Sequence, residues 1–165
     1  MQSTQLNEAR LFAFNSHGEQ KYGQHPYVYH LDAVASLLQP FGEEAQIVGY
    51  LHDVLEDTHV TFDELCTQFG QSIADSVVAV TDESGENRRQ RKAKTNAKLA
   101  LSTNTVAILV KTADRLANLL ESQLDSDTGK LKMYRREHAD FRNAVYRQGL
   151  CESLWKRIDD IIAPT

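Results

Sequence analysis

The feature that most constrains this chain is an acidic segment around a histidine, GYLHDVLEDT at residues 49–58. If the segment is helical, each residue turns the chain by about 100°, and two faces result. One face carries an imidazole, three carboxylates and a glycine that leaves it open to a ligand, namely His52, Asp53, Glu56, Asp57 and Gly49. The other face is apolar and can pack. Because neighbouring carboxylates repel one another without a cation or protons, the segment indicates either a cation site or a solvated acidic helix face.

Composition predicts a single all-α domain over 1–165. A chain of 165 residues with 41% hydrophobic and 25% charged residues is typical of one globular domain with a real core. Three prolines and no clearly alternating apolar segment favour helices over strands. Cys66 and Cys151 have no CxxC spacing, and the N-terminal residues lack the pattern of a signal peptide. We therefore expect a cytoplasmic protein.

The charge balance narrows the class of partner. A net charge of −5 argues against broad binding of nucleic acid. No apolar run approaches the roughly 18 residues that a membrane span needs, so no membrane partner is expected. An acidic protein that handles phosphates would need a local basic patch or a metal. The oligomeric state is not indicated.

Apolar periodicity predicts helices along the whole chain. The expected helices cover residues 4–16, 27–39, 43–56, a short segment opened by a Thr61–Glu64 capping box, 71–80, 105–120, 131–147 and 150–162. Residues 17–26 contain two glycines and a proline and are expected to form a loop. Trp155 is expected to anchor the core of the last helix.

A basic segment follows the predicted helix 71–80. Its cations are Arg88, Arg89, Arg91, Lys92, Lys94 and Lys98. The segment is either a solvated helix face or mobile loop, or a phosphate-attracting edge above a metal site, where cations offset the charge of a substrate.

Residues from three predicted helices could together bind a metal. In helix 105–120, Lys111, Asp114 and Asn118 share one side, with Arg115 alongside. His30 lies in the apolar arc of its own helix and should point inward. An inward histidine alone, or Asp114 alone, is more often structural than a ligand. Two imidazoles and two carboxylates together, from His30, His52, Asp53 and Asp114, suit a borderline or hard divalent ion with open positions. Spacing alone does not bring the three helices together.

The order of these residues resembles the H…HD…D pattern of HD-domain metal-dependent phosphohydrolases. The segments HGEQK, PYVYHLDAVA, GYLHDVLEDT, VTFDELCTQFG, VAVTDES and LVKTADRLANL are similar to the hydrolase domain of RelA/SpoT proteins and their small single-domain relatives. The pair Glu56–Asp57, closely following the HD pair, distinguishes this branch of the family. We expect only the hydrolase half to be present.

The resemblance implies an HD-type helical fold that holds one Mn²⁺ and hydrolyses (p)ppGpp, releasing pyrophosphate from the ribose 3′ position. The metal ligands that it implies are His30, His52, Asp53 and Asp114. Glu56 and Asp57 match the pair that would orient and deprotonate a water at the metal. Asn118 matches a residue near the nucleotide ribose, and Lys21 matches a basic residue that contacts substrate. Lys111 and Arg115 supply further cations near the proposed metal and are expected to bind substrate.

Departures from the family pattern leave other functions open. Gln20 is followed by Lys21 and Tyr22, where the family usually has two basic residues, and the loop before Pro26 looks shorter than usual. Leu31 replaces a common proline. The metal set stays whole, and the changes fall in and beside the loop that borders the nucleotide in the family. The alternatives are a related HD phosphohydrolase acting on ppApp, NADPH or another nucleotide, and a catalytically idle module that binds a nucleotide or a partner.

Overall fold

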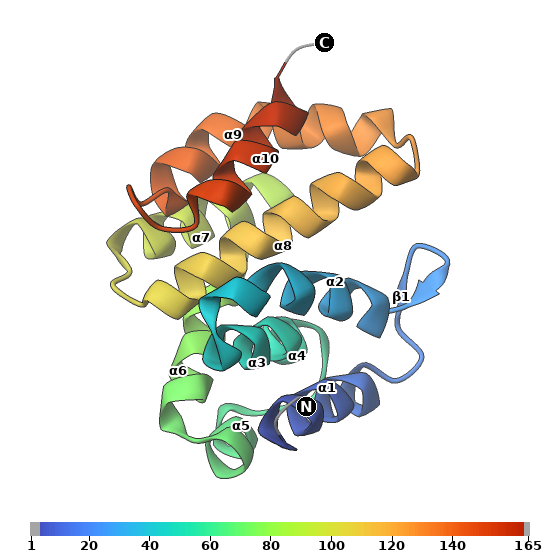
Figure 1. Ribbon diagram of the computed structural model, residues 1–165, viewed down its shortest axis with the longest axis vertical. Helices are drawn as coiled ribbons and strands as arrows, with labels where there is room; N and C mark the ends of the chain where they lie inside the picture. The colour runs from blue at the N-terminus through green and yellow to red at the C-terminus, as the bar shows by residue number, and fades with distance from the viewer. Residues whose placement is uncertain (1–3, 164–165) are drawn as a thin grey trace.

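The structure, a computed structural model, describes residues 4–163 and is almost entirely α-helical (Figure 1). The prediction of an all-α fold is confirmed, whereas the ends of the predicted domain, 1–3 and 164–165, lie outside the described residues. No helix within 4–163 combines the length and apolar character needed to span a membrane.

Helices form in every segment where they were predicted, although the predicted helix 43–56 is divided and several ends shift by up to four residues. The basic segment forms a further helix, α7 (Arg88–Leu101). The bounds of the other helices are α1 (Thr4–His17), α2 (Val28–Leu38), α3 (Glu43–Leu51), α4 (Val54–Asp57), α5 (Phe62–Phe69), α6 (Gln71–Val80), α8 (Thr105–Leu124), α9 (Thr128–Val145) and α10 (Glu152–Ile162). A 3-10 turn, η1 (Gln39–Phe41), follows α2. The predicted loop 17–26 contains a small antiparallel hairpin, in which β1 (Lys21–Tyr22) pairs with β2 (His25–Pro26).

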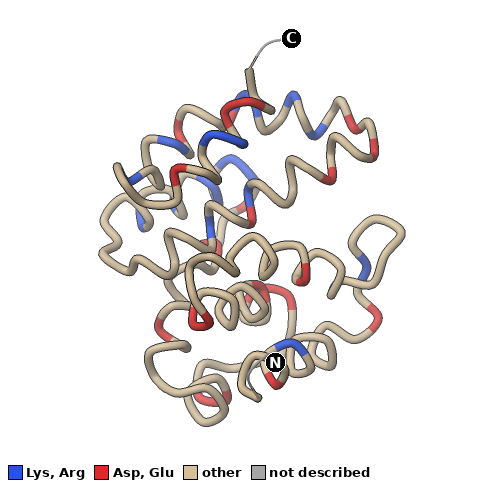
Figure 2. Tube along the Cα trace, in the orientation of Figure 1, with Lys and Arg blue, Asp and Glu red and all other residues tan. Residues whose placement is uncertain are grey.

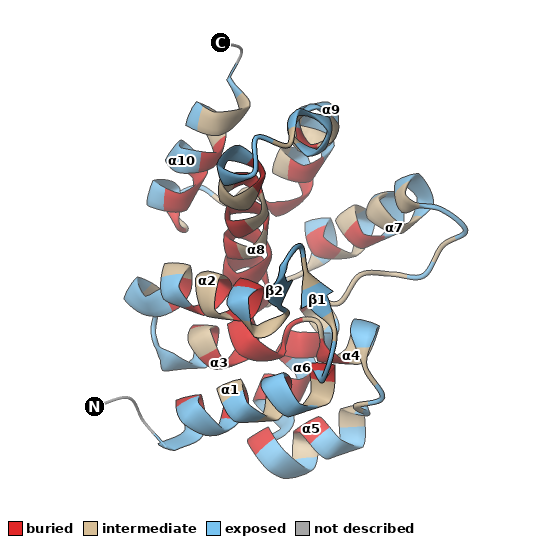
Figure 3. Ribbon diagram, turned by 90° about the vertical axis from the view of Figure 1, so that its right-hand side faces the viewer, coloured by how far each residue is buried: buried red, intermediate tan, exposed pale blue. Residues whose placement is uncertain are grey.

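Helix α8 is the central element of the fold. It packs against α2, α3, α6, α9 and α10, and Figure 3 shows most of its length buried. It begins where the Asn104 side chain accepts a hydrogen bond from the main-chain N–H of Ala107, which caps the helix. Its buried residues include two charged ones, Lys111 and Arg115. Because a buried charge is costly unless it is paired, both side chains need carboxylate partners nearby.

The predicted helix 43–56 is not continuous. It ends at Leu51, and after two residues in a turn the short helix α4 begins at Val54. The break has a local cause. In a continuous helix the Gly49 carbonyl would accept the N–H of Asp53, but here it lies 2.7 Å from Nδ1 of the His52 ring. The prediction of one continuous helix over 43–56 is therefore wrong, and the HD pair lies at the junction of two helices.

Gly49 also has a different role from the expected one. It is buried, and a Cβ built on it would lie 2.6 Å from Cδ1 of Leu38 and 3.5 Å from Cγ1 of Val34 on α2. The missing side chain thus allows α2 and α3 to approach closely and does not open the acidic face to a ligand. This contact brings His30 on α2 next to the turn that carries His52.

Lysine and arginine side chains gather at one end of the molecule, whereas acidic side chains are spread over both ends. Of all lysines and arginines in the sequence, only Arg10 and Lys21 precede residue 81. Figure 2 accordingly shows the blue positions gathered on the part formed by α7–α10. The HD turn lies in the rest of the molecule, which has few cations, and α7 and α8 bring cations toward it.

Candidate metal centre

A pocket of about 170 Å³ lies where the cation-rich part formed by α7–α10 meets the rest of the molecule. Its lining residues come from the hairpin, α2, the HD turn, α4, the loop after α6, and α7–α9. They are Tyr22, Tyr27, His30, Asp53, Glu56, Asp82, Arg88, Lys92, Lys111, Asp114, Arg115, Asn118, Tyr134 and Phe141. Acidic residues and cations thus share one small cavity.

Two imidazoles and a carboxylate converge at this pocket, which His30 and Asp114 line and beside which His52 is buried. One ligand atom each of His30, His52 and Asp114 can be chosen so that all three lie within 4.8 Å of one another. Nε2 of His30 is 3.2 Å from Oδ1 of Asp114, and Nε2 of His52 is 3.7 Å from the same oxygen. The tertiary structure therefore joins α2, the HD turn and α8, which spacing along the chain could not do.

Asp53 lies beside this cluster. Its Oδ2 is 3.0 Å from Nε2 of His52 and 4.0 Å from Nε2 of His30. The same oxygen accepts a hydrogen bond of 2.6 Å from the Tyr27 hydroxyl, which orients the carboxylate. Sequence reasoning missed Tyr27, although its position three residues before His30 places it on the same helical side.

The donor set fits a divalent cation. The Gly49 carbonyl can only accept, so Nδ1 of His52 carries the proton and Nε2 presents a lone pair. That Nε2 is buried and has no hydrogen-bond partner among residues 4–163, although Asp53 and Asp114 lie close. A lone pair aimed at two carboxylates is unfavourable without a cation between them. The cluster is therefore a His/Asp site suited to a divalent metal with mixed nitrogen and oxygen ligands.

The protein charges alone already perturb the site strongly. Burial lowers the pKa of His52, but Asp53 and Asp114 raise it, and the carboxylates prevail. Burial likewise opposes the charged form of Asp114, yet the two imidazoles hold its pKa well below its usual range. Both shifts express a demand for positive charge between these residues, which a metal ion also meets.

Glu56 and Asp57 diverge from one another. Glu56 lines the pocket, and its Oε2 accepts a hydrogen bond of 3.2 Å from the main-chain N–H of Asp82. Burial, with Asp82 and Asp53 nearby, raises the pKa of Glu56. Asp57 is outside the pocket lining, and its Oδ2 accepts a hydrogen bond of 2.8 Å from the Gln20 side chain. Of the predicted pair, only Glu56 is placed where it can face a ligand directly.

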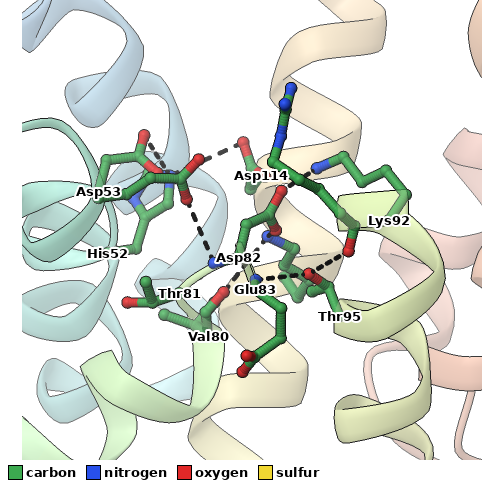
Figure 4. Close-up of polar contacts among 12 residues, drawn as sticks. His52, Asp53, Val80, Thr81, Asp82, Glu83, Lys92, Thr95 and Asp114 are labelled. Carbon is green, nitrogen blue, oxygen red and sulfur yellow. Dashed lines mark hydrogen bonds and ion pairs between the residues drawn. The ribbon is translucent and has the colours of Figure 1, made fainter. Parts of the chain in front are cut away.

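Two carboxylates hold the cations of the pocket. The Asp82 side chain bridges Lys111, at 2.6 Å, and Lys92 (Figure 4). Glu137 on α9 bridges Arg88, at 2.7 Å, and Arg115, at 3.5 Å. Asp82 and Glu137 are thus the carboxylate partners that the buried Lys111 and Arg115 of α8 need. Sequence reasoning assigned no role to Asp82, although the VAVTDES segment that contains it had been singled out.

Arg115 is held by aromatic rings as well as by Glu137. Its guanidinium carbon lies 4.1 Å from the centroid of Phe141 and 4.8 Å from that of Tyr134. The side chain is only 7% exposed, so it lends the pocket positive charge from a fixed position. Burial nevertheless lowers the pKa of Arg115 below its usual value.

The other predicted substrate contacts lie in different places. Asn118 lines the pocket, donates to Oδ1 of Asp114 at 2.6 Å and accepts from the Tyr22 hydroxyl at 2.8 Å. Tyr22 also stacks on the His30 ring, with centroids 4.6 Å apart. Lys21, its neighbour in β1, is exposed and is not a lining residue. The tyrosine that departs from the family pattern therefore occupies the pocket.

The basic segment is a helix, α7, and only part of it reaches the pocket. Arg88 and Lys92 are lining residues. Lys94 instead donates to the Ser84 carbonyl and Lys98 to the Thr81 carbonyl, at 2.9 and 2.6 Å. Arg88 and Lys92 lie on one side of α7, whereas Lys94 and Lys98 lie on another, so of these four cations only the first two face the pocket. That they attract phosphate stays a prediction.

Comparison with known proteins assigns the fold to one family. The family model described as the HD domain matches residues 9–141. The chain belongs to the HD-domain family. The histidine and aspartate residues of its HD turn, together with His30 and Asp114, then form the site described above.

Several relatives of this HD-domain chain carry the same activity in their names. It is 33% identical over 135 residues to the mouse guanosine-3′,5′-bis(diphosphate) 3′-pyrophosphohydrolase MESH1, covering 78% of this chain and 75% of that protein. It is 33% identical over 157 residues to a probable pyrophosphohydrolase of the same name from Synechocystis, covering 90% of this chain but 20% of that protein. The chain spans a fifth or less of the length of the first three curated relatives that it matches.

A solved structure gives the same assignment of fold. A metazoan ortholog of SpoT, described as hydrolysing ppGpp, superposes on this HD-domain chain with a TM-score of 0.84 at 26% identity. The alignment covers 98% of this chain and 95% of that chain. The predicted HD-domain fold is thereby confirmed.

Proposed function

We propose that this protein is a Mn²⁺-dependent (p)ppGpp 3′-pyrophosphohydrolase. The observation that carries the proposal is a single pocket in which a His/Asp cluster faces four cations, Arg88, Lys92, Lys111 and Arg115. A hydrolase acting on a nucleotide with several phosphates needs both parts, one to activate water and one to neutralise the substrate. The names of the relatives, guanosine-3′,5′-bis(diphosphate) 3′-pyrophosphohydrolases, support the same substrate class.

The proposed metal ligands are His30, His52, Asp53 and Asp114. Mixed nitrogen and oxygen donors, with no thiolate among them, suit Mn²⁺ and leave positions open for water and substrate. A divalent ion bound there would acidify a water molecule and neutralise charge on a phosphoryl oxygen.

The remaining steps belong to side chains of this protein. Glu56 accepts a proton from the attacking water, and Asp57, fixed by Gln20, adds negative charge behind it. The water oxygen forms a bond to the phosphorus atom that is attached to the ribose 3′ oxygen. At the same time the bond between that phosphorus and the 3′ oxygen breaks. Pyrophosphate leaves and the 3′ oxygen receives a proton, giving GDP or GTP. Lys111 and Arg115 neutralise phosphate charge and Asn118 contacts the ribose. Lys21, exposed on β1 outside the pocket lining, contacts the substrate only where it extends beyond the pocket.

The deciding experiment is a direct assay of pyrophosphate release. Purified protein with Mn²⁺ is given ppGpp, ppApp, NADPH and a deoxynucleoside monophosphate in parallel. We expect ppGpp to be cleaved fastest and activity to depend on the added metal. Fastest cleavage of the monophosphate would favour another HD phosphohydrolase, and no cleavage of any substrate would favour an idle binding module.

Tyr22, at the edge of the pocket, bears on which base the protein accepts. Tyr22 replaces a family cation and bonds to Asn118, so the edge of the pocket offers an aromatic ring where a charge is usual. An aromatic ring can stack on guanine or adenine alike. The comparison of ppGpp with ppApp therefore tests the base separately from the chemistry.

A further inference from the structure

The loop between α6 and α7 places Asp82 at the centre of a network that reaches the pocket from both sides (Figure 4). The Asp82 side chain is only 6% exposed. One carboxylate oxygen contacts Nζ of Lys111 at 2.6 Å, and the other contacts Nζ of Lys92. Its main-chain N–H donates to Oε2 of Glu56. One residue therefore touches both lysines and the proposed general base.

The three side chains leave an excess of positive charge. Two ammonium groups share one carboxylate, so the group as a whole carries one net positive charge. An ammonium group has three N–H donors. Lys111 uses two of them, on Asp82 and on the Val80 carbonyl, and Lys92 uses one on Asp82. Donors without a partner among residues 4–163 therefore remain on both lysines, and both residues line the pocket.

The loop that carries Asp82 is fixed by neighbouring residues of α7. The main-chain N–H of Glu83 donates to Oγ1 of Thr95 at 2.8 Å, and Lys98 donates to the Thr81 carbonyl at 2.6 Å. The contacts lie on both sides of Asp82 in the chain. The directions of its carboxylate and of its N–H are thus set before any ligand enters.

We propose that Asp82 is a positioning residue that builds a phosphate subsite from Lys92 and Lys111 and holds Glu56 beside it. The inference rests on the proposed function and specifies where that site binds a phosphate group next to the metal. Preorganised donors avoid reorganisation during the reaction, which makes their placement count for more than their charge. Asp82 itself touches no substrate, because it acts through the two lysines and through Glu56.

The first test separates positioning from simple attraction. In the Mn²⁺-loaded protein, Asp82→Asn removes the carboxylate but keeps the main-chain N–H. We expect kcat on ppGpp to fall on the order of 10²-fold, the scale of a small misplacement of reacting groups. The affinity for inorganic pyrophosphate, measured by calorimetry, should change much less than kcat, because the lysines keep their charge while losing their fixed positions. Glu86→Gln, which alters an exposed carboxylate of the same loop outside the pocket, is the matched control and should change neither value.

A second variant tests the subsite without disturbing a buried residue. Lys92 is the more exposed of the two lysines, so Lys92→Gln should fold normally. We expect its affinity for pyrophosphate to fall about tenfold, the scale of one charge-assisted hydrogen bond. Lys94→Gln on the same helix removes an equal charge outside the pocket and should leave the affinity unchanged.

Two results would overturn the inference. One is unchanged kcat in Asp82→Asn, and the other is an equal pyrophosphate affinity in the Lys92 and Lys94 variants. If the unaltered protein cleaves no nucleotide, the proposed function fails. The pyrophosphate titrations of the two lysine variants still decide the subsite in that case, since they need no turnover.

Discussion

At the scale of single residues, one hydrogen bond of His52 determines much of the site. Its Nδ1 donates to the Gly49 carbonyl, which ends α3 and at the same time leaves Nε2 as an acceptor directed at Asp53 and Asp114. The interruption of the helix and the tautomer of the ligand thus have the same origin. A histidine at this position in a continuous helix would not present its ring in the same way.

Removal of this imidazole should abolish metal binding. We expect His52→Ala to lose most of the roughly one Mn²⁺ per chain of the unaltered protein, because a direct ligand and its orienting bond disappear together. Metal content after desalting, measured by elemental analysis, checks the expectation. His59→Ala, which truncates an exposed histidine nearby, serves as the control. Full occupancy in His52→Ala would contradict the ligand assignment.

Glu56 permits a separate test of the chemistry. Glu56→Gln keeps the shape of the side chain but cannot accept a proton, so turnover should fall by roughly 10²-fold or more while metal content persists. Because the pKa of Glu56 is raised, the acidic limb of the pH–rate profile should lie above the usual glutamate value of 4.5 in the unaltered protein. Glu43→Gln, an exposed change in α3, is the control. Near-normal turnover would shift the role to Asp57.

At the scale of elements, the contact between α2 and α3 positions the first histidine. Gly49→Ala would place a methyl group 2.6 Å from Cδ1 of Leu38, which is itself fully buried. Overpacking costs about 1–3 kcal/mol, and the gain in helix propensity returns about 1 kcal/mol of that. We expect a net destabilisation of about 1 kcal/mol in a denaturant titration, with the KM for substrate little changed.

A second substitution identifies the cause of that loss. In a Leu38→Val background the colliding Cδ1 atom is absent, so Gly49→Ala should cost less than in the unaltered protein. The difference between the two costs is the coupling energy of the pair. If Gly49→Ala destabilises both backgrounds equally, the contact with Leu38 is not the reason for the loss. A large rise in KM would instead support the original expectation that Gly49 leaves the acidic face open to a ligand.

At the scale of the whole molecule, the metal site connects segments that are distant in sequence. Its candidate ligands come from α2, the HD turn and α8, and the cations opposite them come from α7 and α8. A metal that binds only the folded state stabilises it, by about 2.7 kcal/mol at a free concentration 100 times the Kd. Removing the metal should therefore loosen the molecule as a whole and not one helix.

Chelation provides the measurement. The melting temperature should fall after treatment with EDTA and return when Mn²⁺ is added in excess. The same additions should leave the melting temperature of His52→Ala unchanged, since that variant lacks the site. A melting temperature that does not respond to the metal in the unaltered protein would contradict a site shared by three segments.

Local patterns in the sequence were sufficient for most of the helices and for the types of residue at the site, but not for the break at the HD pair or for α7. The period of the apolar residues predicted the helices, and the Thr61–Glu64 capping box and the buried Trp155 are present as expected. The resemblance to the family supplied His30, His52, Asp53 and Asp114 as a set. The helices and the cap depend on residues only a few positions apart in the sequence. The ligand set depends on motifs whose order along the chain can be recognised without a structure.

Tertiary packing decided everything that depends on which segments meet. The separation of Glu56 from Asp57, the burial of Gly49 against Leu38 and the sharing of Asp82 by Lys92 and Lys111 have no signature in periodicity. A repeat of 3.6 residues states which side of a helix is apolar, but not which helix covers it. Charges on α7 look alike along the sequence. Only their distances to the loop and to α8 determine which two face the pocket and which stabilise the fold.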